Sequence, residues 1–265
     1  MRIIVPIKQV PETSAVRMDE ATGTMIREGV EAIVNPLDLY AIEAALRLRE
    51  GHGGQVTAVS MGPPKAASAL REAIAMGADD AVLLTDKAFA GSDTWATSCV
   101  LAAAIRRLGV PDMVLCGERA TDGDTGQVGP GIAAWLDLPV ATYVGRIERI
   151  DGGVCRVHRL VEEGYEVLDV QLPAVLTVVK EVAAPRLPTL RGKQRARRQE
   201  VPAWGKGDLD VEESKLGLTG SPTRVVRIFR PTVARQGEVA RPTDEASLEK
   251  AADRLVEFLR ERQLL

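Results

Sequence analysis

The glycine-rich stretch Gly117–Pro130, GERATDGDTGQVGP, is the segment of the chain best suited to bind a ligand. It joins an expected short buried strand, Met113–Cys116, to an expected helix at about Gln127–Leu136, and ligands of α/β proteins bind at such junctions. Glycines let the backbone turn sharply and approach a ligand closely, and the N–H groups that open a helix attract anions. The stretch therefore predicts a phosphate or nucleotide site, with a polar turn that merely caps the helix as the alternative.

The side chains of this stretch add hydrogen-bonding groups that suit ribose or pyrophosphate. These hydroxyls, carboxylates and amide belong to Thr121, Asp122, Asp124, Thr125 and Gln127. The glycines that interleave with them are Gly117, Gly123, Gly126 and Gly129. Their spacing matches neither the Walker loop nor the GxGxxG fingerprint, so the spacing does not identify the nucleotide.

The reactive side chains of the sequence offer no catalytic group. Cys99, Cys116 and Cys155 form no CxxC motif, which favours small buried hydrophobic side chains over a disulfide framework or a thiolate metal cage. The histidines, His52 and His158, lack the spacing of a catalytic or zinc site. We therefore predict no catalytic residue and no metal site, and we expect a bound cofactor to carry any reaction.

The composition is that of an ordinary globular protein. The chain has 265 residues, of which 45% are hydrophobic and 27% charged, enough for one main domain with an appendage. A net charge of −3 gives no overall case for binding nucleic acid or an anionic membrane surface. No stretch approaches the roughly 18 apolar residues of a membrane-spanning helix, and the start, MRIIVPIKQV, predicts a strand rather than a cleavable signal. We expect a cytoplasmic protein without membrane insertion.

Strands alternate with helices over the first half of the chain. The expected strands are Arg2–Lys8, Gln55–Met61, Ala81–Leu84 and Met113–Cys116. Such alternation predicts an α/β fold with a doubly wound, mostly parallel, Rossmann-like sheet and helices on both faces. All strand exits then lie at one edge, where one crevice is expected to be lined by Lys8–Val10, Asn35–Asp38, Met61–Pro64, Ser92–Thr97 and Gly117–Pro130.

Cap residues mark two of the expected helix starts. Asn35 can cap a helix whose first position is Pro36, and Asp38 would complement the positive end of its dipole. Asp93, between Ser92 and Thr94, supplies the cap of a helix that runs to Leu108. Both helices therefore begin at the edge where the crevice is expected.

After Pro139 the pattern changes to antiparallel strands. Val144–Ile150 and Val154–Leu160 alternate around Asp151–Gly153, which indicates a hairpin, and Glu166–Val170 is expected to add a strand. The apolar run Ala174–Val179 is expected to rejoin the main sheet. The fold therefore carries a small antiparallel excursion beside its parallel part.

The last third of the chain is basic and then irregular. Arg186–Arg198, RLPTLRGKQRARR, predicts either a solvated linker or a docking loop for an acidic partner surface. From Trp204 to about Pro242 we expect an arm without a core of its own, ending in an amphipathic helix at Ser247–Leu264. We divide the chain into a nucleotide- or FAD-binding domain, 1–190, and a partner-recognition loop with a C-terminal arm, 191–265.

The chain resembles the electron transfer flavoprotein beta subunit over essentially its full length. The motifs that carry the resemblance are IKQVP at Ile7–Pro11, NPLDLYAIEAALRL at Asn35–Leu48, MGPP at Met61–Pro64, AIAMGAD at Ala73–Asp79 and DGDTGQVGP at Asp122–Pro130. The resemblance implies a heterodimer with an alpha subunit that holds one FAD, a nucleotide site in the beta subunit, and an arm that clasps the partner. In the ordinary branch of the family this nucleotide is AMP.

The resemblance also implies which residues contact the nucleotide. Outside the loop they are Pro6, Asn35, Pro36, Leu37, Asp38 and Met61, to which the expected strand exits add Lys8 and Gly62. Within the loop they are Ala120, Thr121, Asp122, Gly123, Asp124, Thr125, Gly126, Gln127, Val128, Gly129, Pro130 and Gly131. These are the residues of the crevice that the strand exits predict.

A narrower resemblance is to the electron-bifurcating branch, in which the beta subunit holds a second FAD. TDKAFAGSDTWATS at Thr85–Ser98 and GLTGSPT at Gly217–Thr223 carry it, together with DGDTGQVGP. It implies that NADH reduces the beta-bound FAD, whose electrons divide between the alpha-subunit FAD and a low-potential acceptor such as ferredoxin. Polar groups for a full dinucleotide would come from Asp93, Thr94 and Thr97.

Leu190 matches the family's partner-recognition leucine, which inserts into an acceptor dehydrogenase of the acyl-CoA dehydrogenase or quinone-linked type. The basic tail RGKQRARR departs from the bifurcating sequences, so the sequence does not identify the acceptor. Two alternatives remain open: an ordinary subunit in which AMP is structural, and a nucleotide-binding regulatory module or ATP-cleaving enzyme. The second is disfavoured because no Walker loop or catalytic base accompanies the site.

Overall fold

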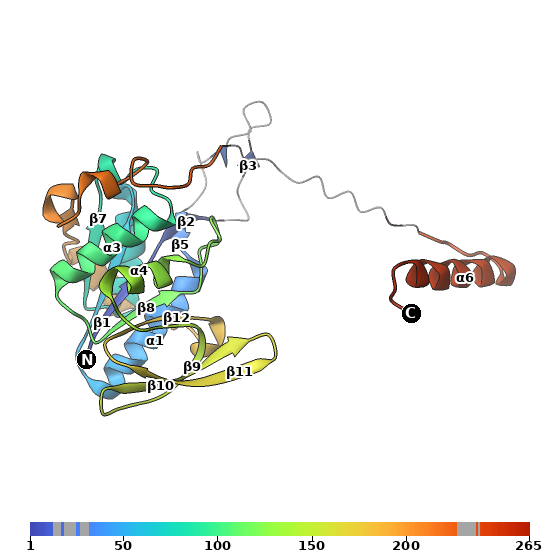
Figure 1. Cartoon of the computed structure of the whole chain (residues 1–265), viewed down its shortest axis with the longest axis horizontal. Coiled ribbons are helices and arrows are strands. Elements are labelled where there is room, and N and C mark those ends of the chain that lie inside the picture. The colour runs from blue at the N-terminus through green and yellow to red at the C-terminus, as the bar shows by residue number, and fades with distance from the viewer. Residues whose placement is uncertain (13–16, 19–24, 27–31, 227–236, 238) are drawn as a thin grey trace. The chain divides into compact units, whose positions relative to one another are not determined.

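The computed structural model describes residues 1–12, 17–18, 25–26, 32–226, 237 and 239–265. Contacts within the chain divide it into two compact units, Met1–Arg227 and Ile228–Leu265. The first unit holds the sheet with its flanking helices, and the second holds the terminal helix α6 (Figure 1). The division after residue 190 stays a prediction about domain organisation.

A nine-stranded sheet forms the centre of the first unit, in the order β11-β10-β9-β12-β8-β1-β6-β7-β13. The strands are β1 Arg2–Pro6, β6 Gln55–Met61, β7 Asp80–Leu84, β8 Met113–Gly117, β9 Val140–Asp151, β10 Val154–Val161, β11 Gly164–Gln171, β12 Ala174–Val178 and β13 Ala203–Trp204. Neighbours from β9 to β13 in this order run parallel, whereas β10 is antiparallel to both of its neighbours, β9 and β11. The predicted α/β fold, with its mostly parallel sheet, hairpin and returning strand β12, is confirmed.

Two short antiparallel pairs lie between β1 and the first helix in the sequence. They join β2, Gln9–Pro11, to β5, Ala32–Val34, and β3, Arg17–Met18, to β4, Met25–Ile26. The sequence did not indicate them, because runs of two or three residues are too short to show an alternating pattern.

Helices cover both faces of the sheet and build one core on each. On one face, α1 (Pro36–His52) and α2 (Ala67–Met76) pack against the inward side chains of β1, Ile3 and Val5. On the other face, α3 (Thr94–Leu108) and α4 (Val128–Leu136) pack against Ile4. Successive residues of β1 thus serve opposite cores, as the strand geometry requires.

The three cysteines are free and buried, as predicted, and Cys116 and Cys155 belong to these cores. Burial raises the pKa of the Cys155 thiol to about 11, which makes this group a small apolar side chain at neutral pH. Among the described residues no group of His, Cys, Asp or Glu could hold a metal. Across the same residues, no helix has the length and apolar character needed to cross a bilayer.

The basic segment contains a helix, α5 (Leu190–Arg198), where a linker or a loop was expected. Thr189 caps this helix by accepting a 2.9 Å hydrogen bond from the Gly192 N–H. Arg195 donates to the backbone oxygens of Ile74 and Ala78, so α5 is fixed to α2. The prediction was wrong because a helix held by arginine-to-backbone bonds needs no apolar stripe in its sequence.

The expected arm also begins later than predicted. β13 pairs with β7, and Leu209 and Leu216 are buried in the core of the α3 face. An arm is therefore the wrong description of residues 203–216, which lack a core of their own but share that of the sheet. β13, an edge strand of the nine-stranded sheet, thus comes from a segment whose composition predicts irregular structure.

The second unit ends in α6, Glu245–Glu261, which confirms the predicted amphipathic helix. Asp244 caps it by accepting a 2.8 Å hydrogen bond from the Ser247 N–H. None of its residues, all of which the structure describes, is buried, and Leu248 and Leu255 are more than half exposed at 56% and 58%. Within the described part of the second unit, no residue covers the apolar face of α6.

Candidate nucleotide-binding site

The predicted crevice lies where the chain reverses its direction across the sheet. From β1 the chain adds β6 and then β7 on one side, and it then returns to place β8 on the other side of β1. In open α/β sheets, ligands bind outside the carboxyl ends of the strands at this switch point. The loop that follows β8, residues 118–127, leads from this point into α4.

Asn35 fixes this loop and does not cap its own helix, contrary to the expectation from sequence. Its Nδ2 donates to the Arg119 carbonyl oxygen at 2.8 Å, and its Oδ1 accepts from the Thr121 N–H at 3.2 Å. Within the described chain, the Asn35 side chain makes no cap bond to α1. Asn35 is only 1% exposed, and a buried amide needs hydrogen-bond partners. Its side chain finds them in the backbone of the loop, which it thereby holds in place.

Asp38, in the first turn of α1, is a buried carboxyl between two strand ends. Its Oδ2 accepts a 2.7 Å hydrogen bond from the Lys8 N–H, at the end of β1. Burial raises the pKa of Asp38 to about 7, although the Lys8 hydrogen bond acts in the opposite direction. A Cβ at Gly117, the last residue of β8, would overlap Asp38 Oδ1, so glycine is required for this close approach.

Three side-chain contacts tie the loop to its surroundings and to itself. Lys8 Nζ lies 2.6 Å from Asp122 Oδ1, and Arg119 lies 3.1 Å from Asp124 Oδ2. Thr94 Oγ1, at the start of α3, donates to Thr125 Oγ1 at 3.0 Å. The structure thus brings together predicted residues from the exits of three strands, β1, β7 and β8.

The start of α4 is open to a ligand. Gln127 is the residue before its first turn, and among the described residues neither Gln127 nor any other side chain makes a cap hydrogen bond to this helix. Gly129 in this turn packs so closely on Thr177 of β12 that a Cβ would overlap the threonine methyl group. The free N–H groups and the positive end of the dipole make this helix start a suitable place for a phosphate.

The start of α3 is closed by protein groups. Asp93 Oδ1 accepts from the Ala96 N–H at 3.1 Å, and its Oδ2 accepts from the N–H and the hydroxyl of Thr223 at 2.9 and 2.8 Å. The Asp93 N–H donates to Ser221 Oγ at 2.8 Å. Burial would raise the pKa of Asp93, but the hydrogen bonds from Ala96 and Thr223 hold it below its ordinary value. The predicted cap is confirmed.

The other predicted site residues lie along the same edge of the sheet. Pro6 is the buried last residue of β1, Met61 is the half-buried last residue of β6, and the Gly62 N–H donates to Leu84 O at 3.0 Å. Exposed positions are Pro36, Thr121, Asp122, Gly123, Asp124, Thr125 and Gln127. Half-buried positions are Leu37, Thr97, Ala120, Gly126, Val128, Pro130 and Gly131.

Arg119 and Thr177 belong to this site but were not singled out from the sequence. The Arg119 carbonyl oxygen accepts a hydrogen bond from the Asn35 side chain, and the Thr177 methyl group packs against Gly129. Arg119 lies inside the glycine-rich stretch, so its position alone could have indicated it. Thr177 lies in a buried apolar run, where a lone polar residue, 2% exposed, indicates a specific partner.

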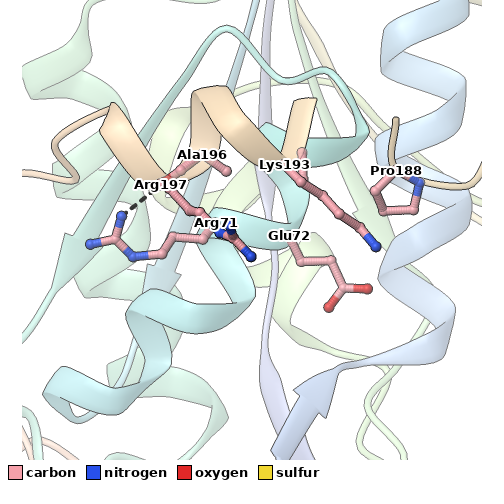
Figure 2. A pocket seen from close by; sticks show the side chains of 7 residues that line it. Arg71, Glu72, Pro188, Lys193, Ala196 and Arg197 are labelled. Atoms are coloured by element: carbon pink, nitrogen blue, oxygen red, sulfur yellow. Dashed lines mark hydrogen bonds between the residues drawn. The ribbon is translucent and has the colours of Figure 1, made fainter. Parts of the chain in front are cut away.

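The structure also contains a pocket of about 450 Å³ between α2 and α5, lined by none of the predicted nucleotide-binding residues (Figure 2). Arg71 of α2 donates to the Ala196 carbonyl oxygen of α5 at 2.9 Å, and Glu72 and Lys193 extend into the space between the helices. Its lining is Arg71, Glu72, Ala75, Pro188, Lys193, Ala196 and Arg197. This pocket is formed where α5 packs on α2.

Comparison with known proteins identifies the family. Residues 22–209 match the model of the electron transfer flavoprotein domain. The electron transfer flavoprotein subunit beta of Thermoanaerobacterium thermosaccharolyticum is 48% identical over 100% of both chains. The caffeyl-CoA reductase-Etf complex subunit CarD of Acetobacterium woodii is 47% identical, also over 100% of both. Protein FixA of Azorhizobium caulinodans is 48% identical over 88% of this chain and 85% of its own.

These similarities extend across the sheet, the loop after β8 and the segments that close the start of α3. The family match covers most of the chain, and the relatives match at full or nearly full length. The chain therefore belongs to the electron transfer flavoprotein family and, within it, to the beta subunits.

Proposed function

We propose that this chain is the beta subunit of a heterodimeric electron transfer flavoprotein whose crevice at β1 and β8 holds an FAD used for electron bifurcation. The observation that carries the proposal is the uncapped start of α4 beneath a loop that Asn35 holds in place. Uncapped backbone N–H groups beside the carboxyl ends of parallel strands suit the phosphates of a nucleotide. The chain has oxidoreductase activity only within the complex.

The side chains around α4 fit the remaining parts of an adenine nucleotide. Lys8 supplies a cation beside the loop, and Asp122, Asp124 and Thr125 supply oxygens that can accept from ribose hydroxyls. Asn35 and Asp38 set the loop and the end of β1 without facing solvent. FAD, when bound, accepts a hydride from NADH and passes its electrons on singly. The residues of this chain bind and orient it.

The choice of FAD rests on the contact between two helix starts. The 3.0 Å bond from Thr94 to Thr125 joins the start of α3 to the loop, so polar groups of α3 lie beside the loop, where a dinucleotide could use them. Thr97 lies one helical turn further along α3. The similarity to a subunit of the caffeyl-CoA reductase-Etf complex also supports a role in a larger redox assembly.

AMP is the second candidate, and the bonds of Asp93 favour it. Because Thr223 and Ala96 occupy both carboxylate oxygens of Asp93, this group offers little to a second half of a dinucleotide. A nucleotide confined to the α4 side would then be structural, and the redox work would occur on the FAD of the alpha subunit. A nucleotide-binding regulatory module is a distant third candidate.

The partners follow from two exposed apolar surfaces. The uncovered face of α6 suits an alpha subunit that the C-terminal segment clasps. Leu187 and Leu190, 87% and 81% exposed, precede and begin the rigid helix α5, which suits an acceptor dehydrogenase of the acyl-CoA dehydrogenase or quinone-linked type. Ferredoxin would be the low-potential acceptor. We place the complex in the cytoplasm, with no membrane insertion and no nucleic acid partner.

Counting flavins tests the cofactor. The heterodimer is purified, its nucleotides are released by denaturation, and FAD and AMP are quantified against protein. Two FAD per heterodimer are expected. One FAD with one AMP would instead establish the ordinary branch, and one FAD without any second nucleotide would contradict nucleotide binding by this chain.

Replacing Leu190 tests the acceptor surface. In the heterodimer, Leu190→Ala should leave flavin content and reduction by NADH unchanged while lowering acceptor turnover by about tenfold, because a single apolar anchor fixes a transient encounter. Leu187→Ala is the matched control, since this leucine is equally exposed but lies outside α5. The measurements are stopped-flow flavin reduction and steady-state acceptor turnover. Equal turnover for both variants would exclude Leu190 as the anchor.

A further inference from the structure

Tyr143 has a backbone conformation that its residue type disfavours. Its φ is +56° inside β9, whereas Asp137 and Gln263, two other residues with positive φ, lie within two residues of the ends of α4 and α6. For a bulky aromatic residue such a φ is an outlier, and outliers of this kind concentrate at functional sites. Tyr143 does not lie at the end of a helix, so its positive φ needs another explanation.

A bulge in β9 produces this conformation. β12 advances by two residues from Leu176 to Val178, while its partners on β9, Ala141 and Val144, are three residues apart. The Tyr143 N–H leaves the strand ladder and donates to Thr177 Oγ1 at 3.1 Å. A bulge re-aims the side chain that it carries, and bulges are over-represented beside active sites.

The side chain of Tyr143 is aimed at the loop before α4. Its hydroxyl lies 3.8 Å from the position that a Cβ would occupy on Gly126. The same Thr177 that binds the Tyr143 N–H packs against Gly129, so one threonine positions both the tyrosine and the first turn of α4. Tyr143 thus stands directly beside the open helix start.

Packing does not explain why the strained conformation persists. The residue is 43% exposed, and among the described residues its hydroxyl has no hydrogen-bond partner. A tyrosine retained for packing would bury its ring and satisfy its hydroxyl with a protein group. Here a hydroxyl without a partner among the described residues lies beside Gly126, in the loop that leads into α4.

We infer that Tyr143 is a further nucleotide-contacting residue, whose hydroxyl donates a hydrogen bond to a phosphate or ribose oxygen of the adenine nucleotide held at α4. This inference rests on the proposed function. A neutral phenol is a suitable donor to a phosphate oxygen at neutral pH, and the bulge holds it in place before the ligand arrives.

The test uses the full-length chain in its heterodimer, depleted of the beta-site nucleotide, with AMP and FAD as separate probes in equilibrium dialysis. Tyr143→Phe keeps the ring and removes the hydroxyl, and it should weaken binding of the probe that occupies the site about tenfold. Tyr143→Gly removes the strain and the side chain together, so it should keep the wild-type unfolding midpoint and weaken binding at least as much. Tyr165→Phe, at another exposed tyrosine, is the matched control and should bind as wild type does.

The outcomes separate this inference from the function on which it rests. If wild type binds a nucleotide and Tyr143→Phe binds it within twofold of wild type, the inference is overturned and the proposed function stands. If Tyr143→Gly binds as wild type does, the inference is overturned as well. If wild type binds neither AMP nor FAD, the proposed function fails and the inference fails with it.

Discussion

The helix starts on the two sides of the crevice are completed in opposite ways. On the α3 side, Asp93 accepts from its own helix and from Thr223, so the polar groups there satisfy one another. On the α4 side no described side chain caps the helix, and the polar residue that could cap α1, Asn35, is committed to the loop instead. The hydrogen-bonding groups at the start of α3 are therefore occupied, whereas the start of α4 has no side-chain cap among the described residues.

This difference shows what a cap residue reports. A cap fixes the place where a helix begins, and it also consumes the N–H groups that a ligand would need. Where a glycine-rich junction lacks a cap, long-range side chains such as Asn35 must hold the backbone, and the donors remain free for a ligand. Asp93 caps α3, whereas Gln127 does not cap α4. This contrast favours α4 as the place for the phosphates, and it is a better guide than counting the polar residues near each helix start.

The largest expected effect concerns Asp38, the buried carboxyl beneath the open side. Because the pKa of Asp38 is raised from 3.8 to about 7, the folded chain holds this proton at pH values where the unfolded chain has lost it. The stability contribution is complete below about pH 4 and is lost as the pH rises through about 7, a loss of about 4 kcal/mol. Asp38→Asn should remove this slope.

Urea unfolding between pH 4.5 and pH 8 measures the effect over most of the interval, about pH 4 to 7, in which linkage acts. An asparagine oxygen can still accept from the Lys8 N–H, so the variant should fold. Asp210→Asn, at an exposed aspartate, is the control and should leave the slope unchanged. A slope that survives in Asp38→Asn would mean that other groups cause it.

Opening the closed side should have the next largest effect. Asp93→Ala removes the α3 cap and the bonds to Thr223, so the free energy of unfolding should fall by about 1–2 kcal/mol. If the α3 side is only a wall, AMP binding should stay within twofold of wild type. Asp93→Asn, which keeps a cap oxygen, is the control, and urea unfolding with AMP titration gives both quantities. Loss of AMP binding would make Asp93 part of the AMP site.

The same contrast explains which features could be read from the sequence. The α3 start was predictable because Ser92, Asp93 and Thr94 are adjacent and act locally. Asn35 looked like a local cap as well, but its partners, Arg119 and Thr121, come from a distant loop that no local pattern reveals. Sequence therefore predicted which strand exits meet at this edge of the sheet, but it could not assign the hydrogen bonds between them.

Two further features lay beyond local patterns for a related reason. The helix α5 is stabilised by bonds from Arg195 to carbonyl oxygens of α2, which is a property of the docked pair rather than of its own sequence. The bulge at Tyr143 arises from register between β9 and β12, strands that are separated by the whole hairpin. Features that depend on the partner element can be found only once the topology is known.

A smaller effect on stability, with a large effect on binding, is expected at Gly126 in the loop before the open helix start. Its φ is +62°, so Gly126→Ala should cost about 1 kcal/mol of stability and should displace the phosphate-binding backbone. Gly152→Ala is the matched control, because Gly152 has φ +55° and open space around its Cβ position in the hairpin turn. Both variants should unfold at similarly lowered urea concentrations, but only Gly126→Ala should lose bound nucleotide. Equal nucleotide content in the two variants would exclude the loop as the phosphate cradle.

The smallest expected effect lies at Thr94, where the two sides of the crevice meet. Thr94→Val removes the 3.0 Å bond to Thr125 and should cost about 0.5–1 kcal/mol, because neither hydroxyl is fully buried and water can replace the partner. FAD, which would extend from α4 toward α3, should bind about threefold more weakly, whereas AMP, held at α4 alone, should bind as before. Thr94→Ser retains the hydroxyl and is the control. Parallel titrations of the nucleotide-depleted heterodimer with FAD and AMP measure the difference. Equal weakening of both ligands would show that Thr94 acts only by holding the loop. The start of α3 would then contact neither FAD nor AMP directly.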